Sequence, residues 1–424
     1  MYVLKDATKR TFARDAKTEQ TVRGILENVR KNGDAELRAL SLQFDHLELP
    51  YLRVPPEEIR AAYDKVAPET VEALRKAAEQ ITFYAEQQLA CLKPLDVASP
   101  IPGVRLGHRL LPVEAAGAYV PGGRYPLPST ALMLAIPARV AGVKRIAACS
   151  PPSRQYGTIH PAVLVAMDIA GVTEAYCVGG AQAVAALAYG TETIPAVDLI
   201  VGPGNRFVTE AKRQVLGDVG IDSLAGPSEV LILADETAQP DFVAIDLLAQ
   251  SEHDPNARAT LVTPSEALGR AVLERLPLLA QTLSTGEAAL KSWEDNGLVL
   301  IPETMDACIA AANDMAPEHL EVQVDPAKED EIAAQLHNFG SLFIGSYAPV
   351  AFGDYCSGTN HTLPTMRTAR YANGVWPGTF LKTSFVQHIS EEGCRNMAAT
   401  CIHLAGVEGL MAHQRSVSLR VEEK

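Results

Sequence analysis

Hydrophobic positions show two different spacings along the chain. In the first hundred residues, apolar side chains recur every three or four positions behind Thr or Pro, which predicts helices over 18–32, 56–66 and 68–92. From about residue 106 onward, short β-branched runs alternate with helical apolar stripes. The runs predict buried strands over 116–120, 145–149, 175–178, 198–201, 229–234 and 259–262. The stripes predict helices over 129–141, 161–170, 181–188 and 206–216.

This alternation favours an α/β fold with parallel sheets, because parallel strands need crossover connections that cover both sheet faces. A second α/β half is expected to continue to about residue 370. A stretch marked by Gly and Pro over 373–377 then leads into a helical tail over 391–415. The chain is longer than one compact domain normally is, so we expect two or more domains.

Charge and composition narrow the possible partners. The 424 residues contain 37 Lys and Arg against 51 Asp and Glu, which gives a formal net charge of -14, and no basic block interrupts this balance. Nucleic acid and anionic membranes both need a concentrated positive footprint, so neither is an expected partner. No apolar run approaches the roughly 20 residues of a membrane-spanning helix, and residues 1–14 are charged throughout. We therefore expect a cytoplasmic protein.

The cysteines exclude one kind of metal site. They number seven, are widely scattered and form no C-x-x-C pair. A disulfide framework and a thiolate metal site are therefore both disfavoured. Any bound metal must use nitrogen and oxygen ligands.

Three loops with glycine each follow an expected strand and lead toward a helix. They are Tyr119-Val-Pro-Gly-Gly, Val178-Gly-Gly-Ala-Gln and Val201-Gly-Pro-Gly-Asn. Ligands of open parallel sheets bind beyond the carboxyl ends of the strands, where glycine and helix N-termini accommodate phosphate. None of the loops is a G-x-G-x-x-G fingerprint, and each alone is more typical of a tight turn. Three in succession favour a nucleotide-like ligand.

Gln250 and His253 stand three positions apart at the end of an expected helix, so their side chains share one face. Asp354 and His413 are candidates for further ligands. One amide, one carboxylate and two imidazoles suit Zn²⁺ with a coordination position open to substrate. The alternative for His253 is a capping or surface role.

Glu318 and His319 are adjacent in the segment Ala316-Pro-Glu-His. The proline predicts an extended or turn conformation, and a base of near-neutral pKa beside a carboxylate suits proton transfer. A solvated pair on a loop is the alternative for this segment.

Together, these segments closely resemble the histidinol dehydrogenase family, whose zinc- and NAD-dependent members catalyse the last two steps of histidine biosynthesis. The resemblance covers nearly the whole chain, up to Arg420. It rests on the three glycine loops, the second extending to Thr191, and on Ala225-Gly-Pro-Ser-Glu, Gln250-Ser-Glu-His, Ala316-Pro-Glu-His, Ser357-Gly-Thr-Asn-His and residues 408–413.

The resemblance implies a role for each matched residue. NAD is bound by Tyr119, Gln182 and Asn205. Zinc is held by Gln250, His253, Asp354 and His413. The substrate contacts are Ser228, His361 and Glu408, together with the zinc ligands and His319. Glu318 and His319 match the catalytic pair, so that His319 removes the alcohol proton during the first oxidation and Glu318 activates water for the second. No cysteine thioester is required.

The same resemblance implies two incomplete Rossmann-like domains with parallel sheets, plus small helical N- and C-terminal domains. We expect a helical segment over 1–17, and a first α/β domain over 18–118 and 229–370 that carries the metal and catalytic residues. An NAD-binding domain is expected over 119–228, and a dimerisation tail over 371–424. In the implied homodimer, this tail completes the partner's site.

Two segments depart from the family pattern. Arg124-Tyr125 replaces the usual small residues after Pro-Gly-Gly, and residues 369–378 also differ. Both are similar to a paralogous branch that oxidises 2,3-dihydroxypropane-1-sulfonate to 3-sulfolactate with the same zinc and NAD. Arg124 would pair with a sulfonate, with a cofactor phosphate or with a surface carboxylate.

Residues 354–361 and 412–417 instead match the histidinol enzyme. We therefore expect oxidation of L-histidinol to L-histidine, with the sulfonated diol as the alternative substrate. A binding protein that has lost zinc or cofactor is a third possibility. It is disfavoured because every matched ligand and catalytic position holds a competent residue type.

Overall fold

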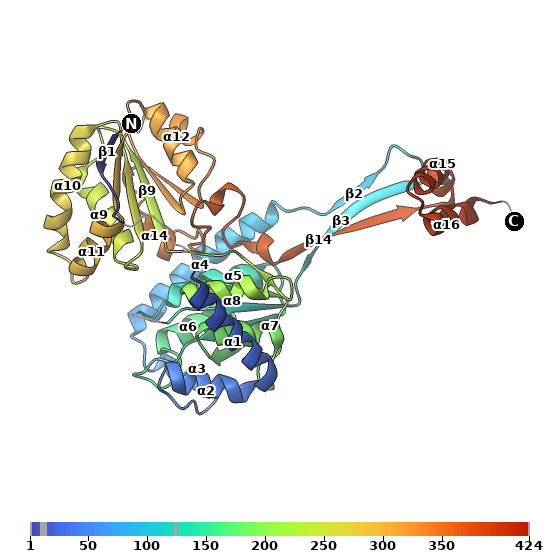
Figure 1. The fold of residues 1–424 in the computed structure, drawn as a ribbon, viewed down its shortest axis with the longest axis horizontal. Coiled ribbons are helices and arrows are strands. Elements are labelled where there is room, and N and C mark those ends of the chain that lie inside the picture. The colour runs from blue at the N-terminus through green and yellow to red at the C-terminus, as the bar shows by residue number, and fades with distance from the viewer. Residues whose placement is uncertain (1, 9–14, 123–124, 423–424) are drawn as a thin grey trace.

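The computed structural model describes residues 2–8, 15–122 and 125–422. They form two α/β lobes and a long arm (Figure 1). The predicted α/β fold with two parallel sheets is thereby confirmed.

The first lobe is built on a five-stranded parallel sheet of order β6-β5-β4-β7-β8. Its strands are β4 (Ala115–Tyr119), β5 (Arg145–Ser150), β6 (Glu174–Cys177), β7 (Leu199–Val201) and β8 (Gly220–Ile221). The crossover helices are α5 (Pro128–Val140), α6 (Pro161–Ala170), α7 (Gly180–Tyr189) and α8 (Arg206–Val215). Helix α6 is apolar nearly all round because α3, α4 and α5 all pack on it.

The second lobe is built on a six-stranded sheet of order β1-β11-β10-β9-β12-β13. Its parallel strands are β9 (Glu229–Ala234), β10 (Arg258–Val262), β11 (Leu298–Ile301), β12 (His319–Gln323) and β13 (Ser341–Ile344). Helices α9 (Pro240–Ser251), α10 (Glu266–Ala280) and α11 (Gly286–Asn296) share one apolar cluster with this sheet. Helices α12 (Met305–Met315) and α13 (Glu329–Ala333) share a second cluster with it, and the short α14 (Val350–Tyr355) follows β13.

Two parts of the expected domain division are corrected. The segment expected to be helical over 1–17 begins instead with strand β1 (Tyr2–Lys5), which pairs antiparallel with β11 and packs Leu4 against the core of the second lobe. Helices α1 (Ala16–Asn32), α2 (Asp34–Phe44), α3 (Pro56–Tyr63) and α4 (Pro68–Ala90) pack on the helices of the first lobe. We had expected residues 18–118 to join the second lobe. An apolar stripe shows which helix face is buried, but not which sheet covers it.

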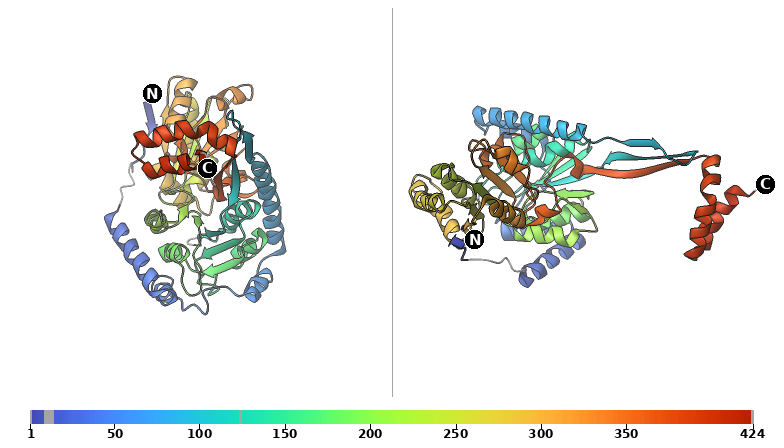
Figure 2. Two further views of the ribbon diagram at one scale, coloured as in Figure 1. Left: turned by 90° about the vertical axis from the view of Figure 1, so that its right-hand side faces the viewer. Right: turned by 90° about the horizontal axis from the view of Figure 1, so that it is seen from above.

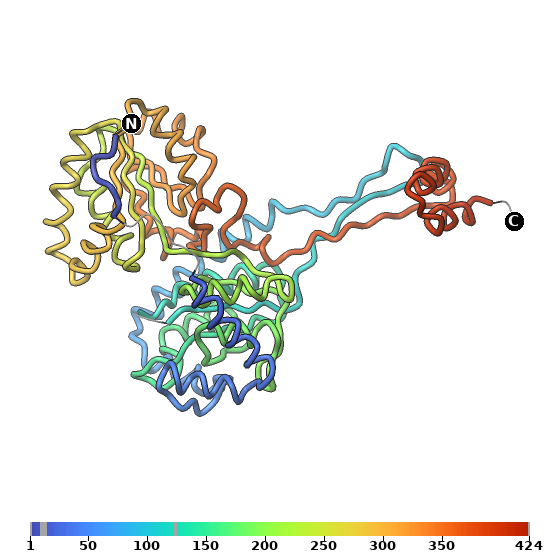
Figure 3. Tube along the Cα trace, in the orientation of Figure 1, coloured from blue at the N-terminus to red at the C-terminus, as the bar shows by residue number. Residues whose placement is uncertain are grey.

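The arm is a three-stranded antiparallel sheet made of β2 (Leu95–Ala98), β3 (Val104–Pro112) and β14 (Leu381–Ile389). It carries α15 (Glu391–Val407) and α16 (Met411–Val421) away from both lobes (Figures 1 and 2). Gly409, with a φ of 72°, separates these two helices where one continuous helix was expected. The chain trace in Figure 3 places the C-terminus at the tip of the arm and the N-terminus beside the second lobe. None of the helices in the described ranges is both long and apolar enough to cross a bilayer.

Candidate active site

The three glycine loops lie at the carboxyl edge of the first sheet, as predicted. Tyr119 ends β4, and its buried hydroxyl accepts a hydrogen bond from the Gly180 N–H at 3.0 Å. Gln182 is buried in the first turn of α7. Asn205 caps α8, where its Oδ1 accepts from Phe207 N at 2.9 Å and Val208 N at 3.2 Å. This edge therefore presents two helix N-termini beside one another.

Gly202 is the tightest point of this edge. Its φ is 123°, and a Cβ there would overlap the carbonyl oxygen of Tyr119. We expect Gly202→Ala to lower the free energy of unfolding by about 2–4 kcal/mol, because strain and overlap add. Gly24→Ala is the control: Gly24 lies in α1 with nothing within 4 Å, and Ala should stabilise that helix by about 0.5–1 kcal/mol. Chemical denaturation measures both changes, and equal stability of the two variants would refute this account of Gly202.

The predicted catalytic pair lies at the amino edge of the second sheet. Glu318 precedes β12, and its Oε2 accepts hydrogen bonds from Ser228 Oγ at 2.6 Å and from Glu229 N at 2.8 Å. His319 begins β12, and its Nδ1 lies 3.1 Å from the Glu229 carbonyl oxygen. Because a carbonyl only accepts, Nδ1 carries the proton and Nε2 has a free lone pair. The two side chains are 6% and 4% exposed, which removes the alternative of a solvated loop pair.

Burial is the main cause of the pKa shifts of both Glu318 and His319. Desolvation raises the pKa of Glu318 to about 8, although the hydrogen bonds from Ser228 and Glu229 oppose the shift. Desolvation also lowers the pKa of His319, which the charge of Asp354 only partly offsets. Neutral imidazole is thus the form at neutral pH, and its Nε2 has no hydrogen-bond partner among the described residues.

Asp354 and His361 complete this side of the site. Asp354 lies on α14, and its Oδ1 is 3.9 Å from His319 Nε2. The Asp354 carbonyl oxygen accepts from His361 Nδ1 at 3.2 Å. His361 Nε2 lies 3.3 Å from the hydroxyl of Thr130 on α5, so this histidine joins the second lobe to the first.

Gln250 and His253 come from the end of α9. Gln250 is 3% exposed, and its Nε2 lacks a hydrogen-bond partner in the described part of the chain. His253 is exposed, and its charge is among the causes that lower the pKa of His361 after burial itself. His253 therefore lies near His361, as Asp354 and His319 do.

Two predicted residues, Glu408 and His413, are not brought to this region by a single chain. Glu408 caps the C-terminal end of α15 and His413 lies on α16, at the far end of the arm (Figure 1). Arg124 lies outside the described residues. In the described ranges, no three His, Cys, Asp or Glu side chains are grouped so that they could hold a metal ion.

Glu229 is a residue that our sequence reasoning missed. Its backbone N–H donates to Glu318 and its carbonyl oxygen lies against His319 Nδ1, so the backbone of one residue holds both members of the pair. Burial and the nearby Glu318 charge raise the pKa of its own carboxyl to about 7. Its position directly after Ser228 in a motif shared with the family could have indicated this role. The pairing of β9 with β12, which brings Glu229 to the catalytic pair, cannot be read from the local sequence.

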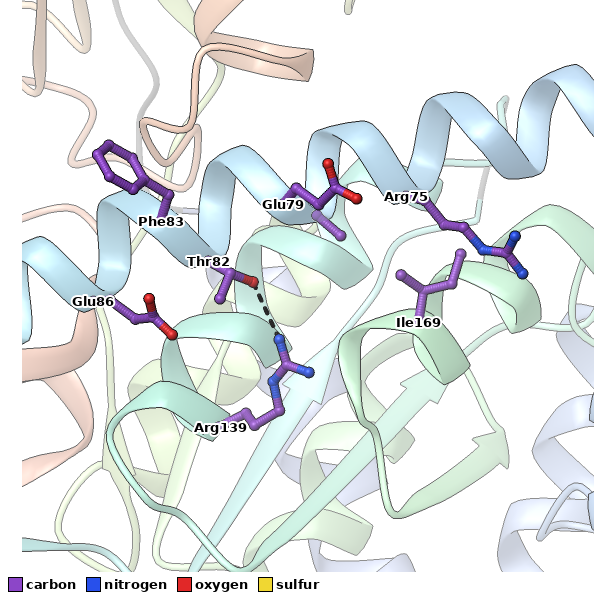
Figure 4. A pocket seen from close by; sticks show the side chains of 8 residues that line it. Arg75, Glu79, Thr82, Phe83, Glu86, Arg139 and Ile169 are labelled. Carbon is purple, nitrogen blue, oxygen red and sulfur yellow. Dashed lines mark hydrogen bonds between the residues drawn. The ribbon is translucent and has the colours of Figure 1, made fainter.

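A hollow on the outside of the first lobe does not coincide with this site. It lies along α4, where Phe83 and Glu86 line it and Arg139 donates to Thr82 Oγ1 at 3.1 Å (Figure 4). No predicted site residue borders it.

Known proteins match the chain over nearly all of its length. The sequence model of the histidinol dehydrogenase family matches residues 8–421. The histidinol dehydrogenase of Gluconobacter oxydans (strain 621H) is 46% identical over 407 residues, which cover 95% of this chain and 93% of that protein. A histidinol dehydrogenase homolog of Shouchella clausii (strain KSM-K16) is 42% identical over 406 residues, covering 96% and 95%. The crystal structure of histidinol dehydrogenase from Elizabethkingia anophelis matches with a TM-score of 0.91 at 35% identity, covering 98% of this chain and 94% of that one. The chain belongs to the histidinol dehydrogenase family.

Proposed function

We propose that the protein is a cytoplasmic, NAD- and zinc-dependent alcohol dehydrogenase that oxidises L-histidinol through a bound aldehyde to L-histidine. The observation that carries this proposal is the buried pair Glu318–His319. The backbone N–H and carbonyl of Glu229 hold the two side chains, and Nε2 of His319 has no hydrogen-bond partner among the described residues. Membership of the family supports the reaction and the cofactor.

In the first oxidation, His319 acts as the general base. Its Nε2 takes the hydroxyl proton while Nδ1 keeps its own proton and donates it in a hydrogen bond to the Glu229 carbonyl, which fixes the ring. Neutral imidazole is available at neutral pH because burial lowers the pKa of His319. The resulting imidazolium gains the nearby Asp354 carboxylate, 3.9 Å from Nε2, as a partner.

In the second oxidation, Glu318 takes a proton from the water that adds to the aldehyde. The Ser228 hydroxyl and Glu229 N–H aim its Oε2 and stabilise its charged form. Overall, one alcohol, two NAD⁺ and one water give one carboxylate, two NADH and three protons, with no covalent enzyme intermediate. When bound, Zn²⁺ would hold and polarise the substrate oxygen, and NAD⁺ would accept hydride.

The zinc ligands we propose are Gln250, His253, Asp354 and His413. The carboxylate of Asp354, whose Oδ1 lies 3.9 Å from His319 Nε2, and the side-chain oxygen of the buried Gln250 would be the oxygen ligands. One chain offers only part of this nitrogen and oxygen set, because His413 lies on the arm. For NAD, we propose the edge formed by Tyr119, Gln182 and Asn205, whose helix N-termini suit phosphate.

A homodimer would supply the missing residues. The arm exposes large apolar side chains that a monomer would leave in water, including Phe385 at 89%, Val407 at 73% and Met411 at 61%. An exchange of arms between two copies would bury them and would bring Glu408 and His413 to the other copy's site. This supports our proposal that the tail completes the partner's site.

The test of this function is a side-by-side NADH assay with L-histidinol and 2,3-dihydroxypropane-1-sulfonate, together with metal analysis of the purified protein. We expect stoichiometric zinc and NADH from histidinol. Turnover of the sulfonated diol alone would favour the alternative substrate. Absence of both zinc and NADH formation would instead favour a binding protein.

The variant Arg124→Ala gives a second test of which of the two substrates the protein oxidises. We expect it to reduce turnover of the sulfonated diol much more than turnover of histidinol, by about tenfold or more, because a charge-assisted pair with the sulfonate is lost. Rates of NADH formation with each substrate measure this. An equal effect on both would remove Arg124 as a selectivity residue.

A further inference from the structure

Strand β12 buries a row of polar side chains. His319, Glu321 and Gln323 alternate along it and therefore point to one face of the sheet. They are 4%, 1% and 2% exposed, although such alternation normally turns the polar face to water. Buried polar groups are costly unless they are paired, so this row needs a specific network.

The network centres on two carboxyl groups. Gln323 Nε2 donates to Asp246 Oδ2 at 3.0 Å and to Glu321 Oε2 at 2.9 Å. The Gln323 amide therefore bridges the two carboxyl groups. Burial raises the pKa of both, and the charge of Asp246 adds to the rise for Glu321.

This pair links the elements that carry three of the proposed zinc ligands. Asp246 lies on α9, one turn before Gln250, and His253 follows the same helix. The other oxygen of Glu321 accepts from Val350 N at 3.0 Å, at the first residue of α14 and one turn before Asp354.

Packing ties the same elements together. Val350 packs against the apolar cluster that contains Val243 and Leu247 of α9. Glu321 itself lies two residues along β12 from His319.

We propose that Asp246 and Glu321, bridged by the Gln323 amide, are positioning residues that hold α9 and α14 in the register required for metal binding beside His319. This inference rests on the proposed zinc site. Neither residue needs to touch metal, substrate or cofactor. Outer-shell partners of this kind commonly change metal affinity by about 10–100-fold.

The test measures Zn²⁺ affinity of the full-length protein by competition with a chromogenic chelator. We expect Glu321→Leu to weaken zinc binding by about tenfold or more, because it leaves Val350 N without its acceptor and removes one of the two acceptors of Gln323 Nε2. Glu321→Gln keeps the shape of the side chain and the acceptor for Val350 N and loses only the acceptor for Gln323 Nε2, so it should stay within about threefold of wild type. Asp246→Ala is the second variant should Glu321→Leu fail to fold, and it is expected to weaken zinc binding as Glu321→Leu does.

Asp235→Asn is the matched control for general destabilisation. Asp235 is 3% exposed in the same sheet and accepts from Thr237 N and Asp325 N, away from α9 and α14. We expect it to lower the Tm while zinc affinity is unchanged.

If wild type binds zinc, either of two results would overturn the inference. One is an unchanged zinc affinity in both Glu321→Leu and Asp246→Ala, and the other is a loss of zinc affinity in Glu321→Gln as large as that in Glu321→Leu. Wild-type protein that binds no zinc would instead overturn the proposed function and this inference together.

Discussion

Replacing His319 with Asn is expected to reduce the rate of alcohol oxidation by about 10²–10⁴-fold, the usual contribution of a general base. Asn can still donate to the Glu229 carbonyl, so the backbone arrangement of β9 and β12 is retained. It has no basic nitrogen where His319 Nε2 stands free. The hydroxyl proton then loses the base whose free nitrogen we propose receives it.

A single-turnover measurement separates this chemical step from binding. NADH formed in the first oxidation should appear slowly in His319→Asn, while the dissociation constant for the alcohol changes little. The matched control is His337→Asn, since His337 is exposed in a loop and its ring Nδ1 lies 3.2 Å from the carbonyl oxygen of Gln335. A first oxidation at the wild-type rate in His319→Asn would assign the proton transfer to another group.

The spacing of hydrophobic residues predicted most of the strands of the two sheets correctly, because these strands are buried on both faces. β4, β5, β9 and β10 lie within a residue of their predicted bounds at each end. Continuous apolar strands are the form that parallel sheets take when helices cover both sides. Strand β12 was not predicted, since its polar alternation is typical of an exposed segment, although the structure buries it.

The site was predictable in part, and for two different reasons. The glycine loops lie at the carboxyl edge of their sheet, where the general rule for parallel sheets places ligands. Glu318 and His319 lie at the opposite, amino edge of the other sheet, against that rule. Their local sequence favoured a solvated pair, and only the resemblance to the family favoured catalysis. What decides their chemistry is the backbone of Glu229, supplied by a strand some 90 residues earlier.

Substitution of Glu318 by Gln is expected to slow conversion of aldehyde to acid by about 10²-fold or more, while the first oxidation changes far less. Gln keeps the acceptor oxygen for Ser228 and the Glu229 N–H but cannot take a proton from water. Aldehyde should therefore be released or should accumulate. NADH yield per substrate and direct assay of the aldehyde measure this, with Glu331→Gln on the exposed side of α13 as control. Acid formation at the wild-type rate would refute the role of Glu318.

The pH dependence of the same variant gives a second, independent result. Because burial raises the pKa of Glu318 to about 8, its carboxylate form increases as pH rises through that value, and so should the wild-type rate of acid formation. The linked stability has the opposite sign. Between the ordinary pKa of 4.5 and about 8, the folded protein holds a proton that the unfolded chain has lost, so stability falls as pH rises across this window. In Glu318→Gln, the rate of acid formation should no longer rise as pH passes 8. The free energy of unfolding should also decrease less between pH 4.5 and 8 than it does in wild type. A wild-type profile that is level between pH 7 and 9 would contradict the raised pKa.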